Sequence, residues 1–247
     1  MLLIMLILIW SAVCILRYTM LRERLIKTMN PTVIVDADAF IANDLRVGDI
    51  VVFSKGDPGI ISKVVGGFLG TCFYHIAIVV RSRKESDPKL YFMHFVDSIA
   101  RGKFFEPSFV CNDNMDSVSL SDIQVVLPKY KDGTMILVLR DKEINSEMNN
   151  DAIWKYGLEV GCGRSYDRRY IAEYLLTMVN NDLDTTHQRM HCNTFLGKLL
   201  EALGITPVSS NPLADYTPGS INDLIMRTGR FTAVYHVLDL SDREEVK

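Results

Sequence analysis

The chain has 247 residues and a formal net charge of −3, with 48% hydrophobic and 23% charged residues. This composition is typical of a globular protein, and the slightly acidic balance gives no support to nucleic-acid binding. Its five cysteines are scattered without a C-x-x-C pair, which argues against a disulfide framework or a zinc ribbon and fits a reducing compartment.

The first sixteen residues are apolar except for Ser11, and a basic segment follows them. The run is slightly shorter than the ~20 residues that span a bilayer, but Arg17 can snorkel and Tyr18 suits the interface. A cleaved signal peptide normally carries its charge before the apolar run, and a core helix normally shows an amphipathic stripe, unlike this segment. We therefore expect a transmembrane anchor over residues 1–20. The basic residues after it predict a body on the cytosolic side.

Residues 21–44 are expected to form a basic juxtamembrane segment and a linker, with Asn30-Pro31 as a breaker. The globular body is expected over residues 45–240. Its first half has strand-like runs bounded by turn residues. The body opens with residues 45–53, in which Gly48-Asp49 is a turn and the run after it, 50–53, is a strand. Further strands are predicted over 75–80, 90–96, 123–127 and 135–139, with a helix over 60–69 and a surface loop over 111–122.

The second half of the body has helical periodicity instead. Helices are predicted over 149–163, 170–179 and 193–203, followed by a final strand over 233–238. Strands that precede helices in this way indicate an α+β fold rather than a parallel, doubly wound sheet.

A cysteine and a histidine, far apart in the sequence, are the main candidates for catalysis. Cys192 lies in the first turn of a predicted helix, where the dipole favours the thiolate and where Asn193 and Thr194 can satisfy free amides. We expect this thiol at the exposed end of the helix. His75 lies at the mouth of an apolar strand. A thiolate and an imidazole that meet in space can attack an acyl carbon, which predicts a cysteine hydrolase or acyltransferase.

Other residues compete for roles in this site. Cys72 is close to His75 in sequence and is a rival nucleophile. His94 is either a cross-strand structural partner or the group that orients the first imidazole, and Asp97 and Ser98 are competing orienters. Each histidine can equally be a satisfied core residue, and a lone cysteine is usually a small buried hydrophobe.

One further pair of histidines has the spacing of metal ligands. His187 and His191 are four residues apart, a spacing that puts two imidazoles on one helix face, as in H-E-x-x-H zinc enzymes. The intervening Gln188-Arg189-Met190 supplies no glutamate for the base position. A His-ligated metal hydrolase is therefore the weaker alternative, and we expect neither a metal nor a cofactor.

Six segments occur in an order that is found in a known family. They are LRVGDIVVFSKG, GTCFYHIAIVV, YFMHFVDS, GRSYDRRY, MHCNTFLGKLLEALG and YTPGSINDL, and together they extend over roughly residues 45–240. In this order and spacing the chain resembles the circularly permuted papain-like thiol hydrolases of the NlpC superfamily, which include bacterial, poxviral and lecithin–retinol acyltransferase-like proteins. Histidine before cysteine is the permuted order.

The resemblance implies an antiparallel sheet packed against helices, with Cys192 as nucleophile, His75 as base and His94 in the third catalytic position. The family often has glutamate at that third position, so His94 is a departure. Asn193 also replaces the serine or threonine that usually follows the nucleophile. About two dozen residues separate the G-x-x-Y-D motif from Cys192 in this chain.

The same resemblance implies roles for Tyr166 and Asp167 in the G-x-x-Y-D motif, and Tyr74 or Tyr166 can add a hydroxyl that stabilises an oxyanion or positions the substrate. Members act on substrates that range from peptidoglycan peptides to acyl chains on lipids. A membrane-anchored body favours a lipid ester or a lipid-modified protein, and the anchor resembles those of large DNA-virus relatives in host or virion membranes. The alternative is a catalytically inactive membrane-bound scaffold or virion protein of the same fold.

Overall fold

The computed structural model describes residues 2–83, 89–96, 107–110, 117–143, 149–162, 164–166, 189–205 and 226–240. The strands of the main sheet are β1 (Thr32–Ile34), β2 (Ile50–Ser54), β3 (Phe73–Arg81), β4 (Leu90–Val96), β5 (Pro107–Val110), β6 (Ser117–Asp122), β7 (Met135–Asp141) and β10 (Phe231–Leu238). The helices are α1 (Leu2–Met29), α2 (Ala37–Asp44), α3 (Ile60–Leu69), α5 (Ile123–Val126), α6 (Asn150–Gly161) and α8 (Cys192–Ala202), with a 3-10 turn η1 (Leu127–Lys129). A separate two-stranded sheet pairs β8 (Ser165–Tyr166) with β9 (Arg189–Met190).

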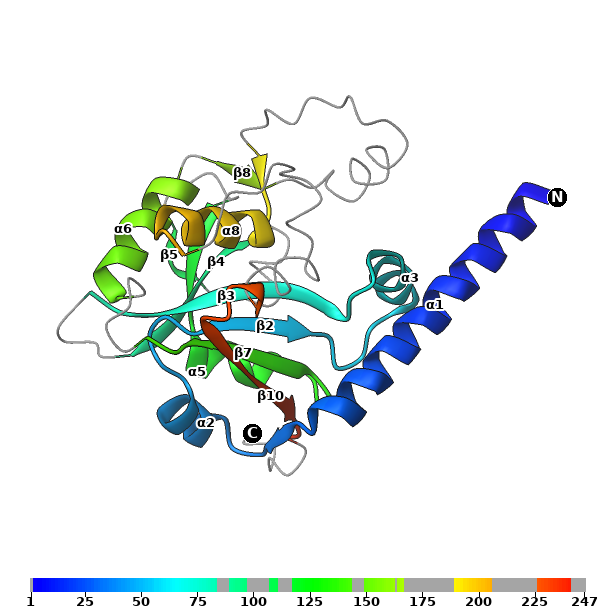
Figure 1. Ribbon diagram of the computed structural model, residues 1–247, viewed down its shortest axis with the longest axis horizontal. Helices are drawn as coiled ribbons and strands as arrows, with labels where there is room; N and C mark the ends of the chain where they lie inside the picture. Colours follow the sequence, from blue (N-terminus) through cyan, green and yellow to red (C-terminus); the bar gives the residue numbers. More distant parts are fainter. Residues whose placement is uncertain are drawn as a thin grey trace.

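The body is an α+β structure on one mixed, eight-stranded sheet, from which α1 projects (Figure 1). The strand order is β1-β10-β7-β2-β3-β4-β6-β5, and the β1–β10 pair is parallel while the other neighbours are antiparallel. This arrangement confirms the predicted α+β class.

Helices cover the sheet on both faces. Successive side chains of a strand point to opposite faces, so Ile76 and Ile78 join the core beneath α6 and α8, whereas Ala77 and Val79 join the core beside α2 and α5. Every residue of β2 is buried. The functional candidates on β3 and β4 therefore lie in the middle of the molecule.

The opening G-D motif of the body forms a specific turn. Gly48 has a φ of 87°, and the buried carboxylate of Asp49 accepts a hydrogen bond from the Arg46 amide at 2.8 Å. Arg140 of β7 pairs with the same carboxylate, with Nη2 2.6 Å from Oδ2 and Nε 2.9 Å from Oδ1. The motif thus fixes the start of β2 beside β7.

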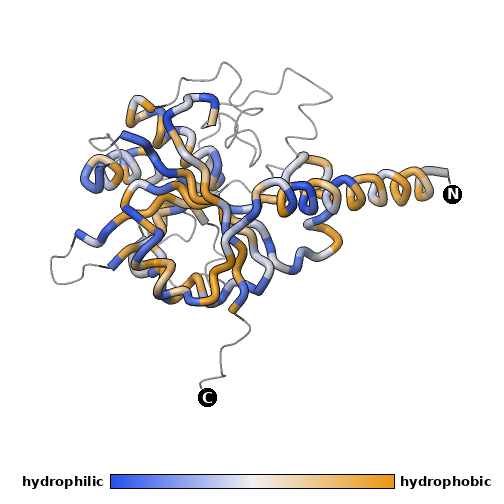
Figure 2. Tube along the Cα trace, turned by 60° about the horizontal axis from the view of Figure 1, so that its bottom comes forward, coloured by the Kyte–Doolittle hydropathy of each residue, from blue (hydrophilic) through white to orange (hydrophobic). Residues whose placement is uncertain are grey.

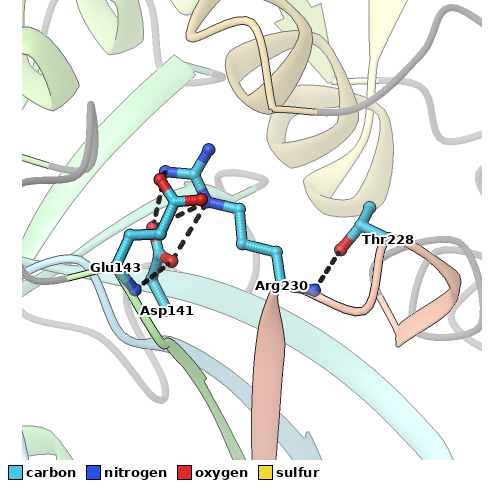
Figure 3. A network of polar contacts seen from close by, with 4 residues as sticks. All are labelled: Asp141, Glu143, Thr228 and Arg230. Atoms are coloured by element: carbon cyan, nitrogen blue, oxygen red, sulfur yellow. Dashed lines mark hydrogen bonds and ion pairs between the residues drawn. The ribbon is translucent and has the colours of Figure 1, made fainter.

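The C-terminal strand is held by another ion-pair network, at the β7–β10 pair (Figure 3). Arg230 directly precedes β10, and its Nε lies 3.0 Å from both carboxylate oxygens of Asp141 at the end of β7. Glu143 lies 3.4 Å from the same guanidinium, and Thr228 accepts a hydrogen bond from the Arg230 amide. These contacts pin the register in which Phe231 faces Asp141.

Several of the predicted elements are confirmed with small shifts of their ends: β2, α3, β3, β4, β7, α6, α8 and β10. The predicted strand over 123–127 is wrong. The Asp122 side chain accepts a hydrogen bond from the Gln124 amide and so caps the start of the short helix α5. The predicted loop over 111–122 is wrong at its end, since 117–122 forms β6 between β4 and β5. The predicted helix over 170–179 lies outside the described residues.

The expected linker over residues 21–44 is structured. The helix that begins in the apolar segment continues without interruption to Met29, and β1 then joins the sheet beside β10. Asp36 caps α2, whose apolar residues enter the core. The body therefore begins before residue 45, and the chain passes from anchor to sheet through two residues only, Asn30 and Pro31.

The N-terminal helix is long and apolar enough over Ile4–Met29 to cross a membrane. Residues 4–9 are exposed and hydrophobic and extend away from the body (Figure 2). The second half of the helix is docked: Tyr18 is buried against Cys72 and Tyr74, and Arg22 Nη2 donates to the carbonyl oxygens of Gly56 at 3.2 Å and Gly133 at 2.8 Å. The body therefore covers the Tyr18 side chain, and its expected depth at the membrane interface stays a prediction.

The cysteines differ from the expected set of free thiols at one position. Cys14, Cys72 and Cys192 are free and buried, but Cys162 is disulfide-bonded. Cys111 lies outside the described residues. A disulfide is typical of an oxidising compartment, so it gives no support to the reducing, cytosolic side inferred from the sequence.

Candidate active site

The site is built where β3 and β4 stop pairing. Their register runs from Arg81↔Leu90 to Ile78↔Met93, although β3 starts at Phe73 and β4 continues to Val96. On its other side, β3 stays paired with β2, where Phe53 faces His75 next to an irregularity in the register. The unpaired ends of the two strands leave room for side chains and for the start of α8.

Two histidines bridge this opening. His75 Nε2 lies 2.8 Å from His94 Nδ1, and His94 Nε2 lies 2.9 Å from Ser121 Oγ on β6. His94 and Ser121 are fully buried. The three side chains form a hydrogen-bonded chain across three strands, which holds the first imidazole in one orientation.

The chain of contacts restricts the proton positions. If His94 donates from Nε2 to Ser121, its Nδ1 is an acceptor and His75 must donate from Nε2. His75 Nδ1 is then the unprotonated nitrogen that can accept a proton. The opposite assignment, in which Ser121 donates, places the proton of His75 on Nδ1 instead.

Cys192 is the first residue of α8. Its helix is capped by His191, whose Nδ1 accepts from the Thr194 amide at 3.4 Å and whose Nε2 lies 2.7 Å from Thr194 Oγ1. The cap was expected from Asn193 and Thr194, so this part of the expectation is wrong. The Cys192 thiol is 5% exposed, because α8 packs its start onto the sheet, which also corrects the expected exposed position.

The Cys192 thiol donates to Asn193 Oδ1 at 3.9 Å, and main-chain groups act on it as well. Backbone hydrogen bonds from Ile76, Asn193 and Cys192 itself act on the thiol and lower its pKa, but burial outweighs them and raises the pKa to about 11. Ile76 directly follows His75 on β3. The backbone of Ile76, next to the predicted base, therefore lies near Cys192. The Cys192 side chain packs in the core beneath α6 and α8, whereas Phe53, which stacks on His75, packs in the core beside α2 and α5.

His75 and His191 are neutral in this environment. Burial lowers the pKa of His75 to about 4 and that of His191 to about 3. Together with the raised pKa of Cys192, these shifts describe a neutral thiol and a neutral imidazole at pH 7. The expected resting thiolate is therefore not favoured here, since desolvation of both groups exceeds the effect of the helix start.

A tyrosine that the sequence did not single out lies beside the site. Tyr130 stacks on Phe53 with 4.9 Å between ring centroids, and Phe53 in turn lies 6.1 Å from the His75 ring. Burial, and then the charge of a Cys192 thiolate, raise the pKa of Tyr130. Its hydroxyl is thus protonated and close enough to Cys192 to sense its charge.

Tyr130 also lines a surface depression of about 460 Å³. The other lining residues are Asp57, Pro128, Lys131, Asp132 and Leu240. Because Tyr130 contacts both the depression and the Phe53–His75 stack, it connects the surface with the buried candidate residues. No local sequence pattern identifies Tyr130, because the turn after η1 places it here.

Two predicted residues lie elsewhere. The Tyr74 hydroxyl donates to the Ser62 carbonyl at 2.6 Å, so it is engaged by α3 and packs near Tyr18. Cys72, the rival nucleophile, is fully buried in the same cluster, and burial raises its pKa to about 11. Neither residue belongs to the core that holds Cys192.

The remaining candidates cannot be placed fully. Asp97, Ser98, Asp167 and His187 lie outside the described residues, and of Tyr166 only the main chain, in β8, is described. Within the described ranges, no group of three or more His, Cys, Asp and Glu side chains is arranged to hold a metal ion. The imidazole of His191, one member of the predicted metal pair, serves as the helix cap.

The site can thus supply a buried thiol, main-chain amides around it, and an oriented neutral imidazole. Comparison with models of known families and with curated proteins finds no match to this chain.

Proposed function

We propose that this protein is a membrane-anchored cysteine hydrolase or acyltransferase that cleaves an amide, ester or thioester bond. Cys192 is the nucleophile, His75 the general base, and His94 with Ser121 orients the base. The observation that carries this proposal is the hydrogen-bonded chain that fixes the His75 imidazole 2.8 Å from His94, and the backbone of the next residue, Ile76, acts on the pKa of the Cys192 thiol. The resemblance to permuted papain-like enzymes assigns the same two residues.

The chemistry starts from the neutral pair. His75 takes the thiol proton as the sulfur attacks the acyl carbon, which forms a tetrahedral oxyanion. Main-chain amides at the start of α8 donate to this oxygen. The C–N, C–O or C–S bond then breaks, and the leaving group takes the proton from His75. Water, or another acceptor, releases the acyl group from Cys192 by the same steps.

Tyr130 is the candidate residue for contact with the substrate. Its protonated hydroxyl can donate to the oxyanion or the leaving group, a role expected from sequence for Tyr74 or Tyr166. The depression beside Tyr130 is the described hollow that lies nearest to this residue, and we propose that substrate enters there.

The proposed substrate class is a lipid ester or a lipid-modified protein. This choice rests on α1, which is long and apolar enough to cross a membrane and which is attached to the body through Arg22 and Tyr18. An active site tied to the bilayer in this way meets lipid-borne substrates at high local concentration. The basic residues after the span favour a body on the cytosolic side, whereas the disulfide at Cys162 is typical of an oxidising compartment and favours the opposite side.

A specific observation also favours a second candidate function, a membrane-bound scaffold without catalysis. The Cys192 thiol is almost fully buried and its pKa is about 11, as in a structural cysteine. In that case the histidine chain stabilises the sheet only.

The test is acylation of the full chain in lipid vesicles by activated acyl esters and thioesters of increasing chain length. We expect a covalent acyl adduct that peptide mapping places on Cys192. The adduct should be absent from Cys192→Ala and retained in the matched control Cys72→Ala, which removes another buried free thiol. Turnover that persists in Cys192→Ala contradicts the proposal.

A further inference from the structure

The structure shows a second apolar element beside the N-terminal helix. Helix α3 is apolar except for Ser62 and Lys63. Its first two residues, Ile60 and Ile61, are 71% and 81% exposed. Adjacent isoleucines this exposed are unusual on a water-facing surface. Figures 1 and 2 place α3 beside the middle of α1, on the side from which the anchor leaves the body.

The two helices are in direct contact through small residues. A Cβ atom on Gly67 would lie 1.8 Å from the Cys14 carbonyl oxygen, and one on Gly66 would lie 2.7 Å from the Tyr18 ring. Further along α1, the rings of Trp10 and Phe68 are 5.6 Å apart. Close packing of backbones at glycine is the usual way in which helices associate inside a membrane.

The depth of this contact follows from the charge that ends the apolar run. A charged side chain is costly in the hydrocarbon region, so we place Arg17 near the membrane surface and the apolar residues before it inside the membrane. Trp10 is seven residues before Arg17, which corresponds to roughly 10 Å along the helix. A residue that contacts Trp10, such as Phe68, must then lie within the hydrocarbon region.

We propose that α3 is embedded in the same membrane leaflet that α1 enters, with Ile60 and Ile61 facing lipid acyl chains. The inference rests on α1 crossing the membrane, and it does not require catalysis. Lys63, the cation of α3, has a long aliphatic stem and can reach the headgroups from this position. The protein is then held by a helix pair, and β3, which starts at Phe73 shortly after α3, begins at the membrane surface.

The test uses a polarity-sensitive fluorophore on single introduced cysteines in the full chain, labelled in detergent and reconstituted into phosphatidylcholine vesicles. Ile61→Cys reports on α3, and Leu8→Cys reports on the anchor itself. Val35→Cys is the matched control, because it is an aliphatic residue, 66% exposed, that follows β1 at the far end of α1. The wild-type protein, labelled in the same way, gives the background signal from the buried native thiols.

We expect the Ile61 and Leu8 probes to be quenched by lipids with a nitroxide on the acyl chain and to resist aqueous iodide, with the reverse at Val35. Iodide quenching at Ile61 equal to that at Val35 overturns the inference. Shielding of Ile61 from both quenchers also overturns it, since protein, such as a second copy of the chain, then covers α3. If the Leu8 probe is not quenched by the nitroxide lipid, α1 does not cross the membrane. The inference that α3 is embedded, which rests on α1, is then overturned too.

Discussion

The His75 and His94 rings meet edge to face, with 2.8 Å between Nε2 of the first and Nδ1 of the second. This contact crosses the point where β3 and β4 stop pairing, so it replaces ladder hydrogen bonds with a side-chain bridge. Since His94 is bound in turn by Ser121, the first imidazole is positioned by a neutral group rather than by a carboxylate.

We expect Ser121→Ala to lower kcat on an acyl ester about tenfold, because the loss of one buried hydrogen bond costs about 1.4 kcal/mol and frees the His94 ring to turn. Ser121→Thr keeps a hydroxyl and should retain most of the activity. KM should stay unchanged in both variants, because Ser121 is too deep to contact substrate. A KM effect with unchanged kcat contradicts this positioning role.

The contact between α1 and α3 gives a test of stability. Gly67→Ala places a Cβ atom 1.8 Å from the Cys14 carbonyl oxygen, so the helices must separate, and overpacking of this kind costs about 1–3 kcal/mol. Gly59→Ala is the matched control at the start of the same helix, where a Cβ atom meets nothing within 4 Å. We expect a lower midpoint of thermal unfolding in detergent for Gly67→Ala only. Equal midpoints for the two variants contradict the packing of α3 on α1.

Acid should destabilise the fold before the carboxylates titrate. The pKa values of His75 and His191 are lowered by burial to about 4 and about 3, so below pH 6.5 the unfolded chain binds protons that the folded chain does not. The free energy of unfolding should be level above pH 6.5 and should fall as the pH drops below it, by up to about 1.4 kcal/mol per pH unit for each histidine. Thermal unfolding between pH 5 and 8 measures this slope. His75→Gln should make it shallower, and a slope that does not change contradicts the burial of neutral His75.

The strands and helices that carry the site could be predicted from local patterns. β3 and β4 are apolar runs between charged turns, and α8 has apolar residues at helical spacing with Gly204 after it. The three apolar residues of α5 fit a strand or a helix equally well in sequence, and only the Asp122 cap decides between them.

The electrostatics of the site could not be predicted, because they depend on packing between distant segments. The start of α8 favours a thiolate by itself, yet contact with the sheet buries Cys192 and reverses the balance. Likewise, Tyr130 lies beside the site because its ring stacks on Phe53, which is more than seventy residues earlier in the sequence. The docking of α1 through Arg22 depends on carbonyl groups, which no residue pattern marks.

The central claim is that His75 activates Cys192. The most direct test is the pH dependence of the rate at which a vinyl sulfone, a thiol-reactive electrophile, labels Cys192 in the full chain in detergent. With His75 as base, the wild-type rate should be level from about pH 6 to 9 and about 100-fold above that of His75→Gln at pH 7. The rate of His75→Gln should instead rise about tenfold per pH unit toward the thiol pKa of about 11. Superimposable profiles for the two proteins, both rising toward pH 11, would contradict the account and leave Cys192 as a structural thiol.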